Sequence, residues 1–182
     1  MLVRAGRKAR AWGGQRWLHA SPPPLRLKSA KAMEAFGADM AAHVPHPSTV
    51  FLVGDLGCGK TCFARGFVRA WTKDPAMHVT SPTYLLMNTY ENEAQRVLYH
   101  MDLYRLDSVS AIDAKAMGLD EAFDSCLNLI EWPDRLKNDL MPATRLEVHI
   151  AYATNTDERL VELKTYGDIW GDVQRWIQSK HE

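Results

Sequence analysis

Residues 49–61 decide the fold, and they read Thr-Val-Phe-Leu-Val-Gly-Asp-Leu-Gly-Cys-Gly-Lys-Thr. The first part, residues 50–53, is apolar and rich in β-branched and aromatic side chains, which predicts a short buried strand. The second part, residues 54–61, fits the pattern G-x-x-x-x-G-K-[ST]. We expect a helix over residues 62–71. A strand, a glycine-rich loop and a helix in this order are the context in which the pattern forms a phosphate-binding site.

Each residue type in the loop has a chemical reason. Glycines permit backbone angles that a Cβ forbids, so backbone N–H groups can converge on phosphate oxygens at a helix N-terminus. Lys60 would neutralise the β- and γ-phosphates, and the Thr61 hydroxyl would bind Mg²⁺. The alternative is a glycine-rich turn with a chance Lys-Thr pair, and the flanking elements argue against it. The candidate nucleotide-binding residues are Asp55, Leu56, Gly57, Cys58, Gly59, Lys60, Thr61 and Cys62.

Two further apolar strands end in acidic residues. The segment 97–102 ends in Asp102, and a strand that begins at Leu127 ends in Glu131, followed by Trp132. P-loop proteins place a ligand for Mg²⁺ or its water at such strand ends. The alternative is a structural aspartate, a surface glutamate and a tryptophan that packs in the core. Two strand-end acids in one P-loop domain favour a functional role for at least one of them.

A third candidate, Thr83, follows Pro82 in the segment 81–84, Ser-Pro-Thr-Tyr. Proline removes a backbone donor and favours an extended residue before it, which indicates an ordered loop. Thr83 either reaches the γ-phosphate or Mg²⁺ as a switch residue or belongs to an ordinary Ser-Pro turn. The local sequence leaves both interpretations open.

Length and charge divide the chain. Its 182 residues, 46% of them hydrophobic, suit one domain with an extension. Eight basic residues precede the first acid, Glu34, which leaves 14 of the 22 basic residues against 22 acidic ones. We predict a basic extension and linker at 1–24 and a single P-loop ATPase domain at 25–182. An acidic domain binds nucleic acid poorly, so we expect no DNA contact, no membrane contact, and an RNA role only through a partner.

Residues 1–20 are rich in arginine, lack acids and carry spaced apolar side chains. This composition predicts a mitochondrial transit peptide. The alternatives are a plastid address, a disordered basic tail, or a cytoplasmic protein if the chain is bacterial. The three cysteines show no metal spacing, and we see no secretory or transmembrane run, which favours a reducing compartment. Cys58 is expected to be a small loop residue, with a redox-sensitive thiol as the alternative.

Hydrophobic periodicity predicts the remaining elements. The fold class that they indicate is α/β, a P-loop NTPase-like three-layer fold with a mixed central β-sheet. Parallel pairing is expected near the phosphate loop, and antiparallel hairpins across the polar turns 91–95 and 154–158. The expected strands, beyond those above, cover 85–90, 145–150 and 159–164, and the expected helices cover 29–43, 108–117, 120–123 and 168–178, the last with Ile169, Val173, Trp176 and Ile177 inward.

The motifs together resemble one family. They are the loop GDLGCGKT and the segments 81–84 (SPTY), 100–106 (HMDLYRL), 118–121 (GLDE) and 130–135 (IEWPDR). Their order and spacing resemble the TsaE (YjeE) family, the ATPase component of the tRNA threonylcarbamoyladenosine system. The resemblance covers about residues 29–165. The combination is specific, whereas the phosphate loop alone fits hundreds of families.

The resemblance implies a function and roles. It implies a slow, partner-stimulated ATPase that uses ATP and Mg²⁺ and supports turnover of TsaB and TsaD, which modify the adenosine next to the tRNA anticodon. It implies that Lys60 binds phosphate, that Thr61 and Glu131 serve Mg²⁺, and that Asp102 is the essential strand-end acid. By position, Trp132 matches the family's functionally sensitive tryptophan, and Thr83 matches its switch-like threonine. Which acid activates water stays open.

Three other functions compete. A GTPase would need a guanine signature, and residues 136–139 carry its residue types in the wrong order. A small-metabolite kinase would need an arginine-rich lid, which does not follow the loop. A non-hydrolysing nucleotide-binding scaffold would not need intact Lys60, Thr61, Asp102 and Glu131. The basic extension departs from the family's bacterial pattern. An arginine finger, which would stabilise charge during hydrolysis, has three candidates in this chain, Arg65, Arg105 and Arg135, and none of them is convincing.

Overall fold

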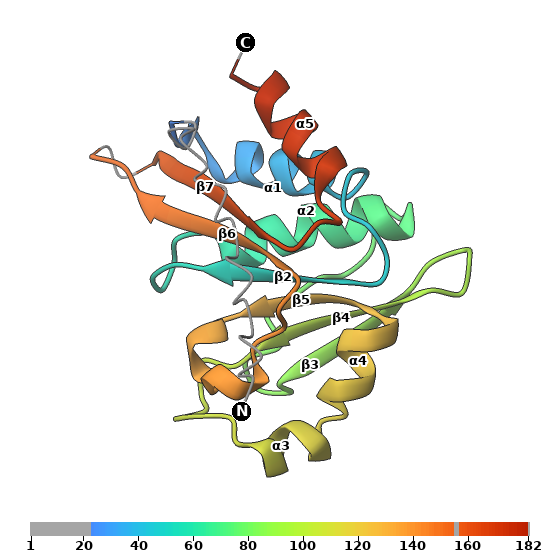
Figure 1. Cartoon of the computed structure of the whole chain (residues 1–182). Helices are drawn as coiled ribbons and strands as arrows, with labels where there is room; N and C mark the ends of the chain where they lie inside the picture. The colour runs from blue at the N-terminus through green and yellow to red at the C-terminus, as the bar shows by residue number, and fades with distance from the viewer. Residues whose placement is uncertain (1–22, 155–156, 182) are drawn as a thin grey trace, which may run out of the picture.

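The computed structural model describes residues 23–154 and 157–181. One seven-stranded sheet runs through it in the order β1-β7-β6-β2-β5-β4-β3 (Figure 1). The strands are β1 (Leu25–Leu27), β2 (Ser48–Val53), β3 (Met87–Glu91), β4 (Val97–Asp102), β5 (Leu127–Glu131), β6 (Arg145–Tyr152) and β7 (Arg159–Tyr166). The helices are α1 (Ala30–Met40), α2 (Lys60–Thr72), α3 (Ala111–Ala116), α4 (Leu119–Ser125) and α5 (Gly171–Ser179), with short 3-10 turns at Pro133–Arg135 and Asn138–Leu140.

The sheet is mixed, which confirms the predicted fold class. The central strand β2 pairs in parallel with β5 and with β6, and β4 pairs in parallel with β5. The hairpins β3–β4 and β6–β7 are antiparallel, and β1 adds an antiparallel edge to β7. Because parallel strands share an edge for their carboxyl ends, the ends of β2, β4, β5 and β6 meet at one side of the sheet.

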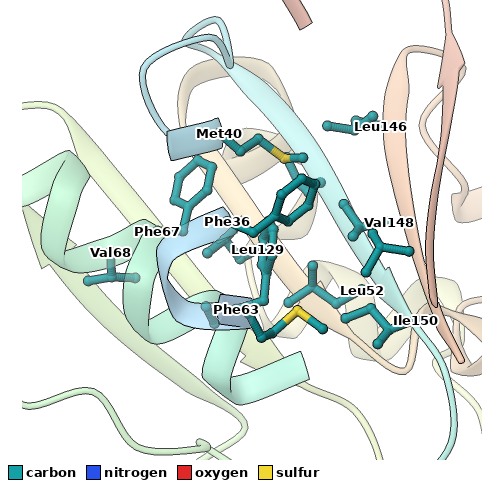
Figure 2. Close-up of a cluster of buried hydrophobic side chains, with 14 of the residues drawn as sticks. Phe36, Met40, Leu52, Phe63, Phe67, Val68, Leu129, Leu146, Val148 and Ile150 are labelled. Atoms are coloured by element: carbon teal, nitrogen blue, oxygen red, sulfur yellow. The ribbon is translucent and has the colours of Figure 1, made fainter. Parts of the chain in front are cut away.

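Helices cover both faces of the sheet. On one face α1, α2 and α5 pack over Val50 and Leu52 of β2, and on the other α3 and α4 pack near Phe51 (Figure 1). This alternation follows from the pleat of a strand that is buried on both sides. Figure 2 shows the first of these cores, where phenylalanines of α1 and α2 meet aliphatic side chains of β2, β5 and β6.

Helices α1 and α2 lie in close backbone contact. A Cβ built on Gly37 of α1 would lie 2.2 Å from the carbonyl oxygen of Phe63 in α2. A Cβ built on Gly66 of α2 would lie 1.8 Å from the carbonyl oxygen of Glu34 in α1. Both helices therefore need glycine where they cross. Helix α1 begins at the expected cap, since Oγ of Ser29 accepts from the N–H of Ala32 at 3.1 Å.

Several predicted boundaries were wrong in instructive ways. Helix α2 begins at Lys60 rather than residue 62, so both Lys60 and Thr61 belong to its first turn. Strand β3 begins two residues late, because Leu86 takes a left-handed backbone with φ of 64° that ends the preceding turn. In the closing segment Ile169 is exposed and Trp170 is fully buried instead. Strand β1 was not predicted at all.

The expected transit peptide lies outside the described residues. Within residues 23–154 and 157–181, we find no helix that is long and apolar enough to cross a membrane.

Candidate functional site

The phosphate loop follows β2 at the edge of the sheet where the parallel strands end. Its backbone depends on glycine at Gly54, whose φ is 152° and whose Cβ would lie 2.2 Å from the carbonyl oxygen of Ile150 in β6. Gly59 caps α2 with φ of 112°, a left-handed conformation that other residues rarely adopt. The first N–H groups of the 13-residue helix α2 have no intrahelical partners. The loop and helix therefore present donors and a positive dipole end to an anion.

The side chain of Lys60 is only 4% exposed and binds the backbone of the phosphate loop. Its Nζ donates to the carbonyl oxygens of Gly54 at 2.8 Å and Asp55 at 2.9 Å. An ammonium has three N–H donors. The third contacts the weak acceptor Sγ of Cys58 at 3.9 Å, and a phosphate oxygen can take its place. The Nζ also lies 4.0 Å from the ring centroid of Trp132, a cation–π contact that orients it.

The carboxylate of Glu131 lies between Thr61 and a histidine that sequence analysis missed. Oγ1 of Thr61 donates to Oε1 at 2.9 Å and lies 3.2 Å from Oε2. Nε2 of the fully buried His100 lies 2.9 Å from Oε1. We assign the proton of the ring to Nε2, because a carboxylate oxygen can only accept. Nδ1 then carries no proton and needs no acceptor. It has no hydrogen-bond partner among the described residues.

Sheet register explains why these side chains meet. Strands β4 and β5 run in parallel with Asp102 opposite Glu131 and His100 opposite Leu129. Residues two apart on a strand share a face, so His100, Asp102 and Glu131 lie on the face that α2 covers. The signal was therefore present: His100 stands two residues before a strand-end acid. Both predicted acids are buried, at 2–3% exposure.

Asp102 is held by the segment that contains Thr83. Its Oδ2 lies 2.6 Å from Oγ of Ser81 and 2.5 Å from Oγ1 of Thr83, and the two hydroxyls lie 2.5 Å apart. Its Oδ1 accepts the N–H of Tyr104 at 3.0 Å. A carboxylate has about four lone-pair sites, so a position remains for a water molecule. The geometry places Thr83 on the strand-end acid, a contact that neither interpretation from the sequence included.

Trp132 directly follows β5 and has a left-handed conformation, with φ of 60° and ψ of 51°. A bulky residue there costs roughly 1–2 kcal/mol relative to the right-handed form. The strained turn lays its ring beside the ring of Tyr104, with centroids 4.9 Å apart, and over Nζ of Lys60. Backbone strain at a pocket wall is consistent with a functional constraint on this tryptophan.

These groups surround one cavity of about 400 Å³. The side chains of Asp55 and Cys58 do not line it: Asp55 points to solvent and Cys58 is buried in the core. Burial raises the pKa of the Cys58 thiol, and the nearby Lys60 opposes the rise only in part. Its place in the core does not suit a redox sensor. The lining residues are Leu56, Gly57, Gly59, Lys60, Thr61, Cys62, Ser81, Thr83, Asp102, Tyr104, Glu131 and Trp132.

Hard oxygen ligands suit Mg²⁺, and the pair predicted for it fits. Adjacent ligands of an octahedral ion at about 2.1 Å lie about 3.0 Å apart, and Oγ1 of Thr61 lies 2.9 Å from Oε1 of Glu131. Within the described ranges no cluster of three His, Cys, Asp or Glu residues could hold a metal. Phosphate oxygens and water would then supply the other ligands of a bound Mg²⁺, as is usual for Mg²⁺ with a nucleotide.

None of the three arginine-finger candidates lines the cavity. Arg65 donates to the carbonyl oxygen of Val79 at 3.2 Å on the flank of α2. Arg105 lies over the ring of Tyr84, 4.1 Å from its centroid. Arg135 lies 3.7 Å from the carboxylate of Asp134. Arg105 is the nearest in sequence to a lining residue, since it follows Tyr104.

Comparisons with known proteins show similarity to one family. The family model described as "Threonylcarbamoyl adenosine biosynthesis protein TsaE" matches residues 27–161. A tRNA threonylcarbamoyladenosine biosynthesis protein TsaE from Rickettsia bellii is 35% identical over 137 residues, or 75% of this chain and 91% of the relative. One from Bacillus subtilis is 35% identical over 133 residues, or 72% of this chain and 78% of the relative.

A solved structure has a similar fold. The crystal structure of YdiB from Bacillus subtilis superposes with a TM-score of 0.68 at 26% identity. The superposition covers 90% of this chain and 99% of YdiB. The P-loop NTPase-like fold predicted from the phosphate loop is confirmed by this likeness and by the mixed sheet. On the family match, the two relatives and this likeness, the chain belongs to the TsaE family.

Proposed function

We propose that this chain is the Mg²⁺-dependent ATPase component of the system that makes N6-threonylcarbamoyladenosine next to the tRNA anticodon. The observation that carries the proposal is the hydrogen-bonded set Thr61–Glu131–His100 beside Lys60 at the mouth of a phosphate loop. Family membership supplies the biosynthetic context, since the relatives are named for this modification. The chain would not itself transfer the threonylcarbamoyl group.

The residues divide the work of phosphoryl transfer. Lys60 and the loop N–H groups would hold the phosphates, and Thr61 with Glu131 would hold Mg²⁺, whose charge would stabilise the negative charge that phosphoryl transfer develops. Asp102, with a free acceptor position at the cavity, orients the attacking water. Thr83 and Ser81 fix that carboxylate. Because none of the three candidate arginines lines the cavity, hydrolysis by the chain alone should be slow.

We propose TsaB- and TsaD-type proteins as partners, with tRNA contacted only through them. Large apolar side chains beside the cavity support a protein contact there. Leu56 of the loop is 67% exposed, and Tyr84 and Leu85, directly after Thr83, are 82% and 75% exposed. A partner seated on them would lie next to Asp102 through Thr83. Such a contact is a direct route by which a partner can stimulate hydrolysis.

We further propose that residues 25–182 form the ATPase domain and that residues 1–24 carry a mitochondrial address. The family match begins at residue 27, after the extension, which supports this division. A fluorescent protein fused behind residues 1–24 should collect in mitochondria. The same fusion with its arginines changed to glutamines should not, and equal distribution of both would contradict the address.

ATP hydrolysis by the full chain tests the function. We expect slow Mg²⁺-dependent turnover alone and faster turnover with TsaB and TsaD. Lys60→Ala and Glu131→Gln should abolish both. The matched control is Lys73→Ala, because Lys73 lies at the other end of α2 and pairs with the exposed Glu93 at 2.9 Å.

The outcomes separate the competing functions. Partner-stimulated turnover that is lost in both site variants and kept in Lys73→Ala supports the proposal. ATP binding without hydrolysis, with partners present, would indicate a scaffold. Phosphorylation of a small metabolite would indicate a kinase, and equal turnover with and without partners would refute the partner-driven ATPase.

A further inference from the structure

Two side chains of the β6–β7 hairpin hold the outer side of the phosphate loop. Oη of Tyr152 donates to the carbonyl oxygen of Leu56 at 2.7 Å. Nε of Arg159 donates to the carbonyl oxygen of Cys58 at 3.0 Å, and Nη2 lies 3.4 Å from that of Gly57. Three consecutive loop carbonyls are thus engaged by one hairpin, far from the loop in sequence.

Tyr152 and Arg159 act as one unit. Tyr152 is the last residue of β6, Arg159 is the first of β7, and the two are cross-strand partners. The guanidinium lies 4.3 Å from the centroid of the tyrosine ring. Nη1 of Arg159 also donates to the carbonyl oxygen of Glu158 at 3.0 Å. This pair is therefore oriented by the sheet and by its own stacking before any ligand binds.

Carbonyl direction controls amide direction. In a trans peptide the C=O of one residue and the N–H of the next point in opposite directions. Holding the carbonyls of Leu56 and Cys58 towards the hairpin therefore turns the N–H groups of Gly57 and Gly59 away from it. Both glycines line the cavity. The N–H of Cys58 is used within the loop, on the carbonyl of Asp55 at 3.2 Å.

Without such a hold, the loop should be mobile. Gly57 and Gly59 have positive φ angles of 75° and 112°, and glycine loses more conformational freedom on ordering than any other residue. Gly57 also permits the contact itself, because a Cβ there would lie 2.9 Å from Oη of Tyr152. The hairpin contacts order the glycines before phosphate arrives.

We propose that Tyr152 and Arg159 are positioning residues that preorganise the phosphate loop for the nucleotide's phosphates. The inference rests on the proposed ATP site, and it goes beyond it by assigning affinity for polyphosphate to a hairpin that does not line the cavity. The pair acts through the backbone of residues 56–58 rather than by touching the nucleotide.

The chain contains its own control pair. Arg145 and Tyr166 are cross-strand partners at the opposite end of the same two strands, with the guanidinium 3.7 Å from the ring centroid. They have the same residue types and the same stacking, and in the described part of the chain Arg145 donates to Glu147 and Pro142 and neither residue has a hydrogen bond to the loop. Tyr166→Phe and Arg145→Lys therefore match Tyr152→Phe and Arg159→Lys in chemistry.

The first measurement is amide hydrogen exchange of residues 55–59 in the full-length protein without nucleotide. Tyr152→Phe removes one donor and keeps the ring, and Arg159→Lys keeps the charge but loses the planar fork. Both should speed exchange in this segment, whereas the control pair should leave it unchanged. Unchanged exchange in Tyr152→Phe and Arg159→Lys would overturn the proposal without reference to ATP.

The second measurement compares binding of Mg²⁺-ATP with binding of tripolyphosphate. Loss of the hydrogen bonds should raise both dissociation constants by the same factor, about threefold for Tyr152→Phe and about tenfold for Arg159→Lys. At saturating ATP, kcat should stay near that of the wild type. A loss confined to ATP would mean that the pair contacts the base instead and would refute the loop role. If the wild type binds neither ligand, the proposed function itself fails, and this inference with it.

Discussion

Replacing Gly66 by alanine should destabilise the protein, although alanine is the better helix former. Alanine in a helix interior gains about 1 kcal/mol over glycine. Against this, the new Cβ would lie 1.8 Å from the carbonyl oxygen of Glu34, whereas real Cβ contacts keep at least 3.0 Å, so α1 must move by about 1.2 Å. Overpacking that shifts a backbone costs up to about 3 kcal/mol. The net loss should be about 2 kcal/mol, or roughly 4–8 °C in Tm for a domain of this size.

Gly37→Ala should act through the same displacement. Its Cβ would lie 2.2 Å from the carbonyl oxygen of Phe63, on the other side of the same helix crossing. Once α1 has moved away from α2 to accept one methyl group, the second methyl group costs little. The double variant Gly37→Ala/Gly66→Ala should therefore lose less stability than the two single losses added together, by about 1 kcal/mol or more.

Urea unfolding followed by far-UV circular dichroism measures all three variants. The control is Gly171→Ala at the start of α5, where a Cβ would meet only the flexible Nη1 of Arg175, at 3.4 Å. Its free energy of unfolding should stay within about 0.5 kcal/mol of the wild type. Equal or greater stability of Gly66→Ala would show that helix propensity outweighs the contact. Strictly additive losses would show that the two glycines do not share one displacement.

Three further predictions concern single residues. His100→Phe removes the donor to Glu131 and should raise the Mg²⁺ concentration for half-maximal ATP hydrolysis by about 10–100-fold, while His100→Gln restores part of the affinity; equal Mg²⁺ dependence in all three proteins would contradict it. Cys58, fully buried and with its pKa raised by burial, should be alkylated more slowly by iodoacetamide than Cys62 and Cys126, as peptide mass spectrometry can measure. Burial raises the pKa of Glu147, but hydrogen bonds from His149 and Arg145 outweigh it and hold the pKa below its ordinary 4.5, so its stabilisation is present above that pH and is lost as the pH falls through the folded-state pKa. Glu147→Gln should thus lower the urea midpoint at pH about 7, and this loss should shrink as the pH falls below the ordinary 4.5 of a glutamate; a loss that stays constant with pH would contradict the argument.

The fold was largely predictable because its strongest signals are local. The phosphate-loop pattern needs only Gly54 to Thr61 in sequence, an apolar run marks β4, and the alternation of apolar residues marks β6 and β7 without reference to neighbours. Strand β1 was not predicted, because an apolar alternation of only three residues next to a run of prolines is too short to indicate a strand. Ile169 was placed inward because the closing helix was expected to begin at residue 168, so Ile169 was given a helical position; Val173 and Trp176, which do lie in the helix, are buried as expected. Helix α5 begins only at Gly171, so Ile169 precedes it.

The acids were predictable and their partners were not. Asp102 and Glu131 each end an apolar strand, a feature visible in one dimension. The contact of His100 with Glu131 needs the additional knowledge that β4 and β5 are neighbours, parallel, and in the register that sets Asp102 opposite Glu131. With that register given, the two-residue period of a strand places His100 on the right face. The missing information was one strand pairing rather than a missing chemical signal.

The contact between the β6–β7 hairpin and the phosphate loop also depends on a strand pairing that local sequence does not reveal. Residues 145–166 contain two arginine–tyrosine cross-strand pairs, Arg145 with Tyr166 and Tyr152 with Arg159. Local sequence gives no ground to prefer one of them as a partner of the loop. Strand order decides: β6 lies beside β2 and runs parallel to it, so the end of β6, at Tyr152, lies at the edge where the loop leaves β2. Two pairs of equal chemistry therefore have different roles, because one parallel pairing brings only one of them to the phosphate loop.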